Sequence, residues 1–388
     1  MLKPKRGTPM ADGTKIEWTD ATWNPITGCS VVSPGCTNCY AMKLAGTRLK
    51  HIPSRAGLTR DTKAGPVWTG EVRFNEQWLD EPLRWQRPRM IFVCAHGDLF
   101  AEGVPDEWID KVFAVMALAP QHIFQVLTKR PDRMRGYLQE MQRCFDSDER
   151  EFSRRWGTAA AEVSGSPCAA GAIEDREYPL PHVWLGVSVE DQPRANERIR
   201  ILLDTPAAVR WISAEPLLGP INLNFLKQPN DGFGCWWLDA LNIDRGGWFN
   251  DEAATQPMDD ADARHHLGRI NWVVAGGESG TGARPMHPHW ANALRDQCAI
   301  ADVPFLFKQW GNWIIASHDN GHYDSAMATN DAIWLDVDGR QAKPSCDGMR
   351  EPIGMFRVTK SRAGRLLDGV EHNGYPPLPA HFKQGADQ

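Results

Sequence analysis

Three cysteines crowded into eleven residues are the strongest chemical signal in the sequence. Cys29, Cys36 and Cys39 form a C-x6-C-x2-C array in a short loop that also contains Pro34 and Gly35. Glycine and proline allow such a loop to wrap tightly around a bound group. Three thiolates can hold a [4Fe-4S] cluster and leave one iron open to a small ligand. The array therefore predicts an iron-sulfur cluster with a free coordination position.

Other uses of these thiols stay open from the spacing alone. A structural zinc site needs a fourth ligand, for which His51 or Cys94 is a candidate, and zinc sites more often combine two C-x2-C halves. Cys36 and Cys39 alone could form a thiol redox pair, which would leave Cys29 without a role. Three unrelated buried cysteines are the plainest alternative.

The composition is that of an ordinary globular protein of 388 residues, with 42% hydrophobic and 24% charged residues. A net charge of −6 argues against a protein that coats DNA nonspecifically. The sequence has no run of about 18 apolar residues and no apolar signal core in residues 1–12, so we expect neither a membrane span nor export. Nine cysteines, an odd number, suit metal binding in a reducing cytoplasm better than a disulfide framework.

Short apolar runs that alternate with helical patterns indicate parallel β/α units, with a sheet covered on both sides. Six such runs cover residues 90–94, 122–127, 183–189, 209–213, 270–275 and 304–307. The clearest helix is expected over residues 106–119, and others follow Pro131, Pro193 and Pro288. The predicted fold class is α/β, a full or partial (β/α) barrel formed by residues 1–311.

Two segments interrupt this alternation of strands and helices, residues 146–181 and residues 226–269. They are expected to be insertions or lids. After residue 311 the pattern changes to short strand-like pieces, with a turn signal at Asp338-Gly339. Residues 312–388 are therefore expected to form a C-terminal extension.

Functional groups of (β/α) barrels gather at the carboxyl ends of the strands. Here several expected strand ends carry polar residues, which would converge on one rim. The candidate residues at these ends are Asp98, Ser188, Glu190, Glu215, Glu278 and Lys308.

Segments along nearly the whole chain resemble the phage and prophage family of three-cysteine radical-SAM-like proteins. They are the cysteine loop with residues 15–25 before it, and residues 98–100, 127–131, 184–190, 213–217, 275–280, 307–311 and 363–369. The resemblance implies a barrel of the radical SAM type, in which the open iron binds S-adenosylmethionine and an electron cleaves it to a 5'-deoxyadenosyl radical. It also implies a reductant protein as partner and, for a phage-encoded protein, the host cytoplasm as location.

The sequence departs from the wider radical SAM superfamily in two ways. That superfamily usually spaces its cysteines C-x3-C-x2-C with an aromatic residue before the third, whereas here six residues separate the first pair and Tyr40 follows. Its Gly-Gly-Glu motif normally follows the second strand and binds the methionine amino group. Here Gly276-Gly277-Glu278 falls near the sixth strand, and Asp98 occupies the place of that role.

The resemblance and the order of the strands assign an expected role to each candidate. Asp98 would accept the methionine ammonium, and Ser188 and Glu190 would bind the ribose hydroxyls or the carboxylate side of the cofactor. Residues from later strands should face the substrate, where a glutamate could shuttle protons. Those expected catalytic residues are Glu215, Glu278 and Lys308. For each single residue, a satisfied hydrogen bond at a strand end remains the alternative.

Basic and aromatic residues occur together at 84–89, 129–137 and 154–156. These segments could contact phosphates, or they could be solvent-exposed faces of helices and loops. With the phage-type resemblance, they favour a radical enzyme that modifies a base in DNA. The specific expectation is thymidine hypermodification, in which N-linked glycinyl-thymidine is isomerised to the carbon-linked form on an extruded or single-stranded base. Alternatives are radical chemistry on a pyrimidine lesion, tRNA or peptide, or a non-catalytic protein that binds zinc or a cluster. The sequence does not indicate an oligomeric state.

Overall fold

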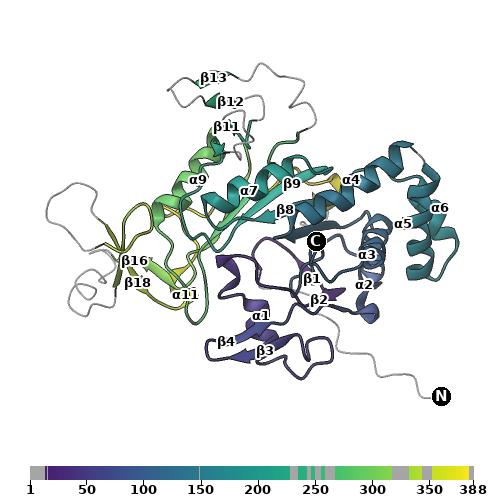
Figure 1. Ribbon diagram of the computed structural model, residues 1–388, viewed down its shortest axis with the longest axis horizontal. Helices are drawn as coiled ribbons and strands as arrows, with labels where there is room; N and C mark the ends of the chain where they lie inside the picture. The colour runs from purple at the N-terminus through teal and green to yellow at the C-terminus, as the bar shows by residue number, and fades with distance from the viewer. Residues whose placement is uncertain are drawn as a thin grey trace.

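The computed structural model describes residues 14, 16–147, 149–227, 235–242, 246–249, 255–257, 267–316, 332–342 and 352–383. At its centre lies a parallel sheet of seven strands in the order β1-β6-β7-β8-β9-β14-β15. The strands are β1 (Ala21–Trp23), β6 (Met90–Val93), β7 (Ile123–Thr128), β8 (Val183–Ser188), β9 (Val209–Ala214), β14 (Trp272–Gly276) and β15 (Phe305–Gln309). β1 and β15 are the two edges of this curled sheet, so the fold is a partial barrel (Figure 1).

Most of the expected elements of the barrel are confirmed. All six apolar runs are strands of the sheet, and the four expected helices are α3 (Asp106–Leu118), α4 (Pro131–Ser147), α7 (Gln192–Leu203) and α9 (Pro288–Ile300). The seventh strand, β1, was not predicted, because three residues are too few to give an apolar pattern. The α/β class and the parallel sheet thus agree with the sequence.

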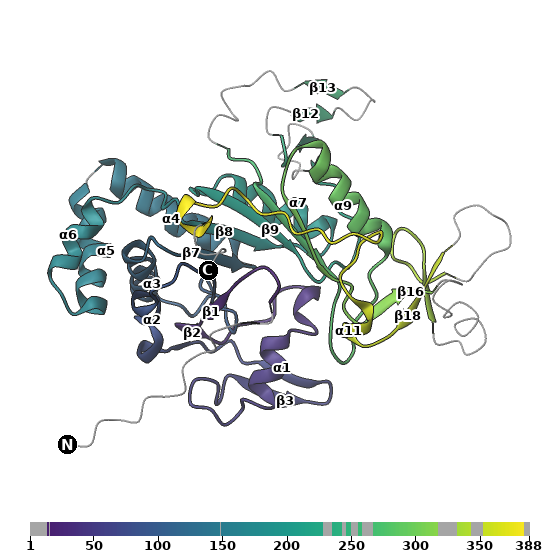
Figure 2. The ribbon, with the colours of Figure 1, turned by 180° about the vertical axis from the view of Figure 1, so that it is seen from behind.

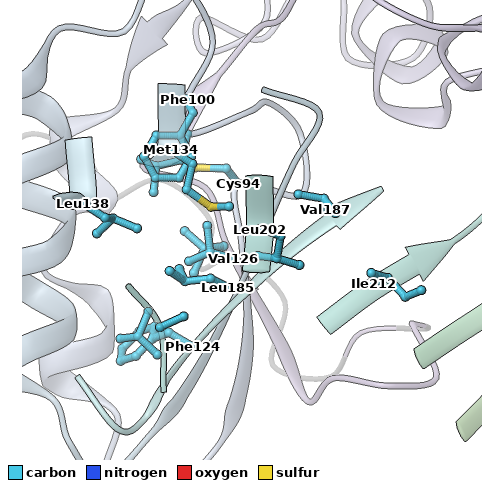
Figure 3. Close-up of a cluster of buried hydrophobic side chains, with 14 of the residues drawn as sticks. Cys94, Phe100, Phe124, Val126, Met134, Leu138, Leu185, Val187, Leu202 and Ile212 are labelled. Atoms are coloured by element: carbon cyan, nitrogen blue, oxygen red, sulfur yellow. The ribbon is translucent and has the colours of Figure 1, made fainter. Parts of the chain in front are cut away.

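The outer face of the sheet packs against helices. α4, α7 and α9 run along this face (Figure 1), whereas α1 (Tyr40–Gly46) packs on short strands outside the sheet. Figure 3 shows Val126 and Leu185 from neighbouring strands beside Leu138 of α4 and Leu202 of α7. This layer forms the main hydrophobic core.

The inner face of the sheet is filled by a second cluster of large side chains. Its fully buried members include Trp184, Trp211 and Trp272 from three adjacent strands, with Trp18 packed across them. A Cβ added at Gly186 would fall 2.5 Å from the indole of Trp211, so glycine provides the room for that ring. The inner face is therefore a packed interior below the strand ends.

The chain between β1 and β6 carries the cysteine loop and small flanking elements. These are β2 (Ile26–Thr27), the 3-10 helix η1 (Pro34–Cys36), α1, β3 (Thr59–Thr62), β4 (Gly65–Trp68), β5 (Arg73–Phe74), the 3-10 helix η2 (Glu76–Trp78) and α2 (Glu81–Arg84). β2 pairs with β5, and β3 pairs with β4. Side chains of α1 and β4 form a small core against which Cys29 and Cys39 of the cysteine loop pack.

The first expected insertion forms two helices, α5 (Glu149–Ser164) and α6 (Cys168–Glu174), which pack against each other and against α3. The second contains a four-stranded antiparallel sheet of β10 (Leu226–Lys227), β11 (Cys235–Leu238), β12 (Gly246–Phe249) and β13 (Thr255–Pro257). Their boundaries as insertions into a domain of residues 1–311 remain a prediction.

The C-terminal part forms a three-stranded antiparallel sheet and then returns to the barrel. The sheet has the order β16 (Trp313–Ile315), β18 (Ile353–Arg357), β17 (Ala332–Leu335), followed by α11 (Lys360–Ala363) and α12 (Ala380–Lys383). The turn expected at Asp338-Gly339 is present, with Gly339 at φ +85°. Beyond α11, the chain crosses the sheet (Figure 2), where the ring of Tyr375 packs against Trp272.

Of the helices in the described ranges, none combines the length and the apolar character needed to cross a membrane.

Candidate functional site

A cavity of about 350 Å³ lies at the carboxyl ends of the parallel strands. This volume falls within the range of ligand pockets, about 300–1,000 Å³. Eight of the nine residues predicted for the site line it, namely Cys29, Cys36, Cys39, Asp98, Ser188, Glu215, Glu278 and Lys308. No described residue of the two expected insertions lines it, so neither forms a lid over this cavity in the described ranges.

The three cysteines are free thiols on one wall of this cavity. Cys36 ends η1, and Cys39 is the N-cap of α1, so the start of that helix fixes the last thiol of the array. Burial, and then the nearby Asp98 carboxylate, raise the pKa of Cys29 to about 12. Burial also raises the pKa of Cys39. A cationic group bound between these sulfurs would favour their thiolate form.

The donor set is three thiols, which fits a cluster held by three cysteines. Among the described residues, no group of three His, Cys, Asp or Glu side chains is arranged to hold one metal ion. Of the two candidate fourth ligands for zinc, His51 is exposed and away from the cavity. Cys94 contributes to the cavity wall but packs with Phe100 and Met134 in the core (Figure 3).

Arg130, which follows β7, anchors the start of the cysteine loop. Its guanidinium donates to the Cys29 sulfur at 3.3 Å, to the Ser30 carbonyl at 3.0 Å and to the Ser30 hydroxyl. On its other side it pairs with Asp98 at 3.1 Å and with Glu102 at 3.2 Å. Arg130 is only 7% exposed, so a fixed cation lies against the first thiol.

Glu190, the ninth predicted residue, does not line the cavity but anchors the middle of the loop. The Ser33 hydroxyl donates to its carboxylate at 2.6 Å, and Lys129 and Arg198 pair with it at 3.1 and 3.2 Å. Burial opposes its ionisation, yet these two cations hold the pKa of Glu190 below its usual value. A Cβ at Gly35 would fall 2.3 Å from this carboxylate, so only glycine permits the close approach.

Glu278, which follows β14, anchors the end of the loop. Asn38, next to the third cysteine, donates to its carboxylate at 2.9 Å, and Arg284 pairs with it at 2.7 Å. Arg284 also donates to the Pro34 carbonyl at 3.0 Å. Burial opposes ionisation, but the hydrogen bonds from Arg284 and Asn38 lower the pKa of Glu278. Three separate strand ends thus hold one short loop.

Asp98 and Ser188 differ in how they meet the cavity. Both carboxylate oxygens of Asp98 already accept hydrogen bonds, from the Thr128 hydroxyl at 2.7 Å, from the backbone of Phe100 and Lys129, and from Arg130. These contacts favour the alternative of a satisfied strand-end carboxylate that positions Arg130. Ser188 lines the cavity at the end of β8, where its own carbonyl accepts from Arg198.

Glu215 and Lys308 form an ion pair of 2.8 Å on the cavity wall, away from the loop anchors. Gln309 donates to the other carboxylate oxygen of Glu215 at 2.9 Å. The side chains of Glu215 and Lys308 are 17% and 14% exposed, so the pair is partly shielded from water. A shielded acid-base pair beside a ligand cavity can exchange a proton with a bound substrate.

The sequence did not assign Asn38, Arg198 or Arg284 to the site. Arg130 was noted in the polar cluster at the strand end of residues 128–130 and in a basic segment, but was given no role of its own in the site. Its position directly after a strand end was the signal that pointed to the site. No comparable signal marked Arg198 and Arg284, whose roles come from carboxylates that other strands supply.

The basic and aromatic segments that suggested phosphate contacts are largely engaged within the protein. Arg89 lies over the ring of Trp85 just before β6, at the opposite end of the strands from the cavity. On α4, Arg135 pairs with acidic residues, and on α5, Arg155 pairs with Asp110 and Glu140. These segments therefore add no support for a nucleic-acid surface, apart from Lys129 and Arg130 at the cavity.

Comparison with curated proteins gave no match, and comparison with solved structures gave none. A family model does match, over residues 13–376, which is nearly the whole chain. Its description is "Protein of unknown function (DUF5131)". The chain therefore belongs to the DUF5131 family.

Proposed function

We propose that this protein is a radical S-adenosylmethionine enzyme that acts in the cytoplasm. The observation that carries the proposal is that three free cysteines of one loop share a cavity with Ser188, Glu215 and Lys308 at the carboxyl ends of a parallel sheet. Cys29, Cys36 and Cys39 would hold a [4Fe-4S] cluster, with S-adenosylmethionine beside it. When bound and reduced by an external electron donor, this pair of cofactors supplies a 5'-deoxyadenosyl radical.

The protein's own residues contribute binding, orientation and proton handling. Arg130, Glu190 and Glu278 hold the cysteine loop against the strand ends. Ser188 offers a hydroxyl to a polar part of the cofactor, such as its ribose. Lys308 pairs with the Glu215 carboxylate beside the cavity, where this carboxylate can accept a proton from the substrate and return it.

The substrate that the resemblance favours is a thymine base in phage DNA that carries a glycine linked through nitrogen. The reaction would be an isomerisation, in which the glycine becomes carbon-linked and the mass of the nucleoside does not change. The aromatic rings of Trp18 and Phe92 line the cavity and give it an apolar surface that suits a planar base. DNA and a reductant protein are thus the proposed partners.

The experiment has two stages. The purified protein is reconstituted anaerobically, reduced, and incubated with S-adenosylmethionine, and release of 5'-deoxyadenosine is measured. DNA that carries N-linked glycinyl-thymidine, and plain DNA, are then added, digested to nucleosides, and separated by chromatography with mass detection. We expect a new nucleoside of unchanged mass from the modified DNA alone.

The two stages separate the class of enzyme from its substrate. Release of 5'-deoxyadenosine with an unchanged nucleoside profile would reject the thymidine substrate and direct the search to a pyrimidine lesion, tRNA or a peptide. One zinc per chain with no 5'-deoxyadenosine would reject the radical enzyme in favour of a metal-binding module.

A further inference from the structure

The contact between Arg130 and Cys29 differs from the contacts that Glu190 and Glu278 make with the cysteine loop. The anchors at Glu190 and Glu278 bind the loop through Ser33 and Asn38, which are not proposed ligands. Arg130 instead donates directly to a ligand sulfur, at 3.3 Å from its Nη1.

The position of this guanidinium is fixed from two sides. Asp98 accepts from Nη1 at 3.1 Å, and this aspartate is itself held by the Thr128 hydroxyl. Glu102 accepts from Nε at 3.2 Å, and the Ser30 carbonyl accepts from Nη2 at 3.0 Å. The buried guanidinium therefore has little freedom to leave the sulfur.

We propose that Arg130 sets the reduction potential of the cluster through its hydrogen bond to Cys29. This inference rests on the proposed function, because it requires a cluster on the three cysteines. Hydrogen bonds to ligand sulfurs are one of the means by which proteins tune cluster potentials. In this proposal Arg130 is a positioning residue that acts through Cys29 and contacts no reacting atom.

The direction of the effect follows from electrostatics. Reduction adds one electron to the cluster, and a buried cation with its donor aimed at a ligand sulfur stabilises the extra negative charge. Removing that donor should therefore make the cluster harder to reduce, and its potential more negative. A less negative potential makes the cluster easier to reduce but also a weaker reductant toward S-adenosylmethionine. The guanidinium would therefore set a compromise between these two requirements.

The test compares four variants of the full chain, each reconstituted anaerobically without substrate. Arg130→Lys keeps a cation but loses the planar fork, and Arg130→Met removes the cation. Arg133→Met is the matched control, because Arg133 lies three residues further along, in the first turn of α4, and pairs with Asp106 away from the loop. Ser30→Ala removes a loop contact of Arg130 while it leaves the sulfur contact in place.

Iron and acid-labile sulfide are measured first, and the midpoint potential is then measured by spectroscopic titration with redox mediators and dithionite. We expect Arg130→Lys to bind iron and to lower the equilibrium constant for reduction about tenfold, which is about 59 mV for one electron. Arg130→Met should shift the potential in the same direction by more, if it retains the cluster. Arg133→Met and Ser30→Ala should keep the wild-type potential.

Two results would overturn the proposal. One is a wild-type potential in iron-loaded Arg130→Lys. The other is a shift in Ser30→Ala as large as that in Arg130→Lys, because it would mean that the position of the loop, and not the bond to the sulfur, sets the potential. Failure of the proposed function looks different, because the wild-type protein itself would then hold no iron and sulfide.

Discussion

The same strands serve two contrasting purposes at their two ends. On β8, β9 and β14 the inner face carries Trp184, Trp211 and Trp272, which pack on one another in a dry layer. A few residues later along these strands the same face carries Ser188 and Ser213, which line the cavity. Side chains two apart point to the same face of a strand, so one continuous surface changes from aromatic to polar.

This difference assigns stability to one end of the strands and chemistry to the other. The tryptophan layer is stabilised by the burial of its apolar area, and the indole N–H groups of Trp211 and Trp272 donate to backbone carbonyls. The cavity end contains buried charges that are stable only as matched sets, such as Glu190 with Lys129 and Arg198. Substitutions at the two ends should therefore have different effects: loss of apolar packing at the tryptophan end, and unpaired charges at the cavity end.

The largest effect is expected at the cysteine loop. Serine at Cys29, Cys36 or Cys39 should reduce bound iron and 5'-deoxyadenosine release to background, because each thiolate holds a different iron. Iron content, with circular dichroism to confirm folding, measures this. Cys168→Ser, at an exposed free cysteine, is the control and should load like wild type. Full iron in any of the three loop variants would remove that cysteine from the ligand set.

At the tryptophan end, Trp272→Ala should lower the free energy of unfolding by about 3–5 kcal/mol, because it opens a cavity among three neighbouring indoles. Denaturant unfolding followed by far-UV circular dichroism measures the loss. Trp85→Ala, at a half-buried tryptophan outside this layer, should cost clearly less. Equal losses at the two positions would mean that the layer has no special part in stability.

Glu190→Gln should lower the free energy of unfolding by about 3 kcal/mol at pH 7, because it leaves the buried Arg198 and the half-buried Lys129 without their counterion. Since the pKa of Glu190 is lowered in the folded protein, its contribution is complete above the unfolded pKa of about 4.3 and is lost as pH falls through the folded value. The gap between wild type and variant should thus narrow below about pH 4.

Urea unfolding at several pH values measures this gap. Glu197→Gln, at an exposed position beside Arg198 on α7, should show no such gap. A gap that stays constant down to pH 3 would contradict the assignment of an ionised Glu190.

Within the cavity, Glu215→Gln should leave iron binding intact and slow product formation about 100-fold, the lower range for a lost acid-base group. The ratio of nucleoside product to released 5'-deoxyadenosine is the sharpest readout, because it should fall while cofactor cleavage continues. Glu71→Gln, at an exposed glutamate, is the control. A parallel loss of both products would move Glu215 from the substrate side to the cofactor side.

The smallest effect is expected where the C-terminal part meets the N-terminal segment. Lys360 pairs with Glu17 at 3.1 Å, and its side chain is 45% exposed. Lys360→Ala should change the free energy of unfolding by less than about 1 kcal/mol, as for other exposed ion pairs. A larger loss in thermal unfolding would show that this contact closes the barrel.

The sequence predicted the strands and helices of the molecule better than the contacts within its site. Apolar runs are local signals, so all six longer strands could be identified, whereas the three-residue β1 could not. The roles of the carboxylates depend on distant partners: Ser33 and Glu190 are 157 residues apart, and Asn38 and Glu278 are 240 apart. No local pattern encodes such pairs, so residues expected to bind cofactor or substrate were found to hold the cysteine loop.

The most direct test of the central claim is the iron and sulfide content of the wild-type protein, prepared anaerobically, together with its electron paramagnetic resonance spectrum after reduction. The account predicts about four iron and four sulfide per chain and a reduced-cluster signal that changes when S-adenosylmethionine is added. One zinc per chain without acid-labile sulfide would contradict it.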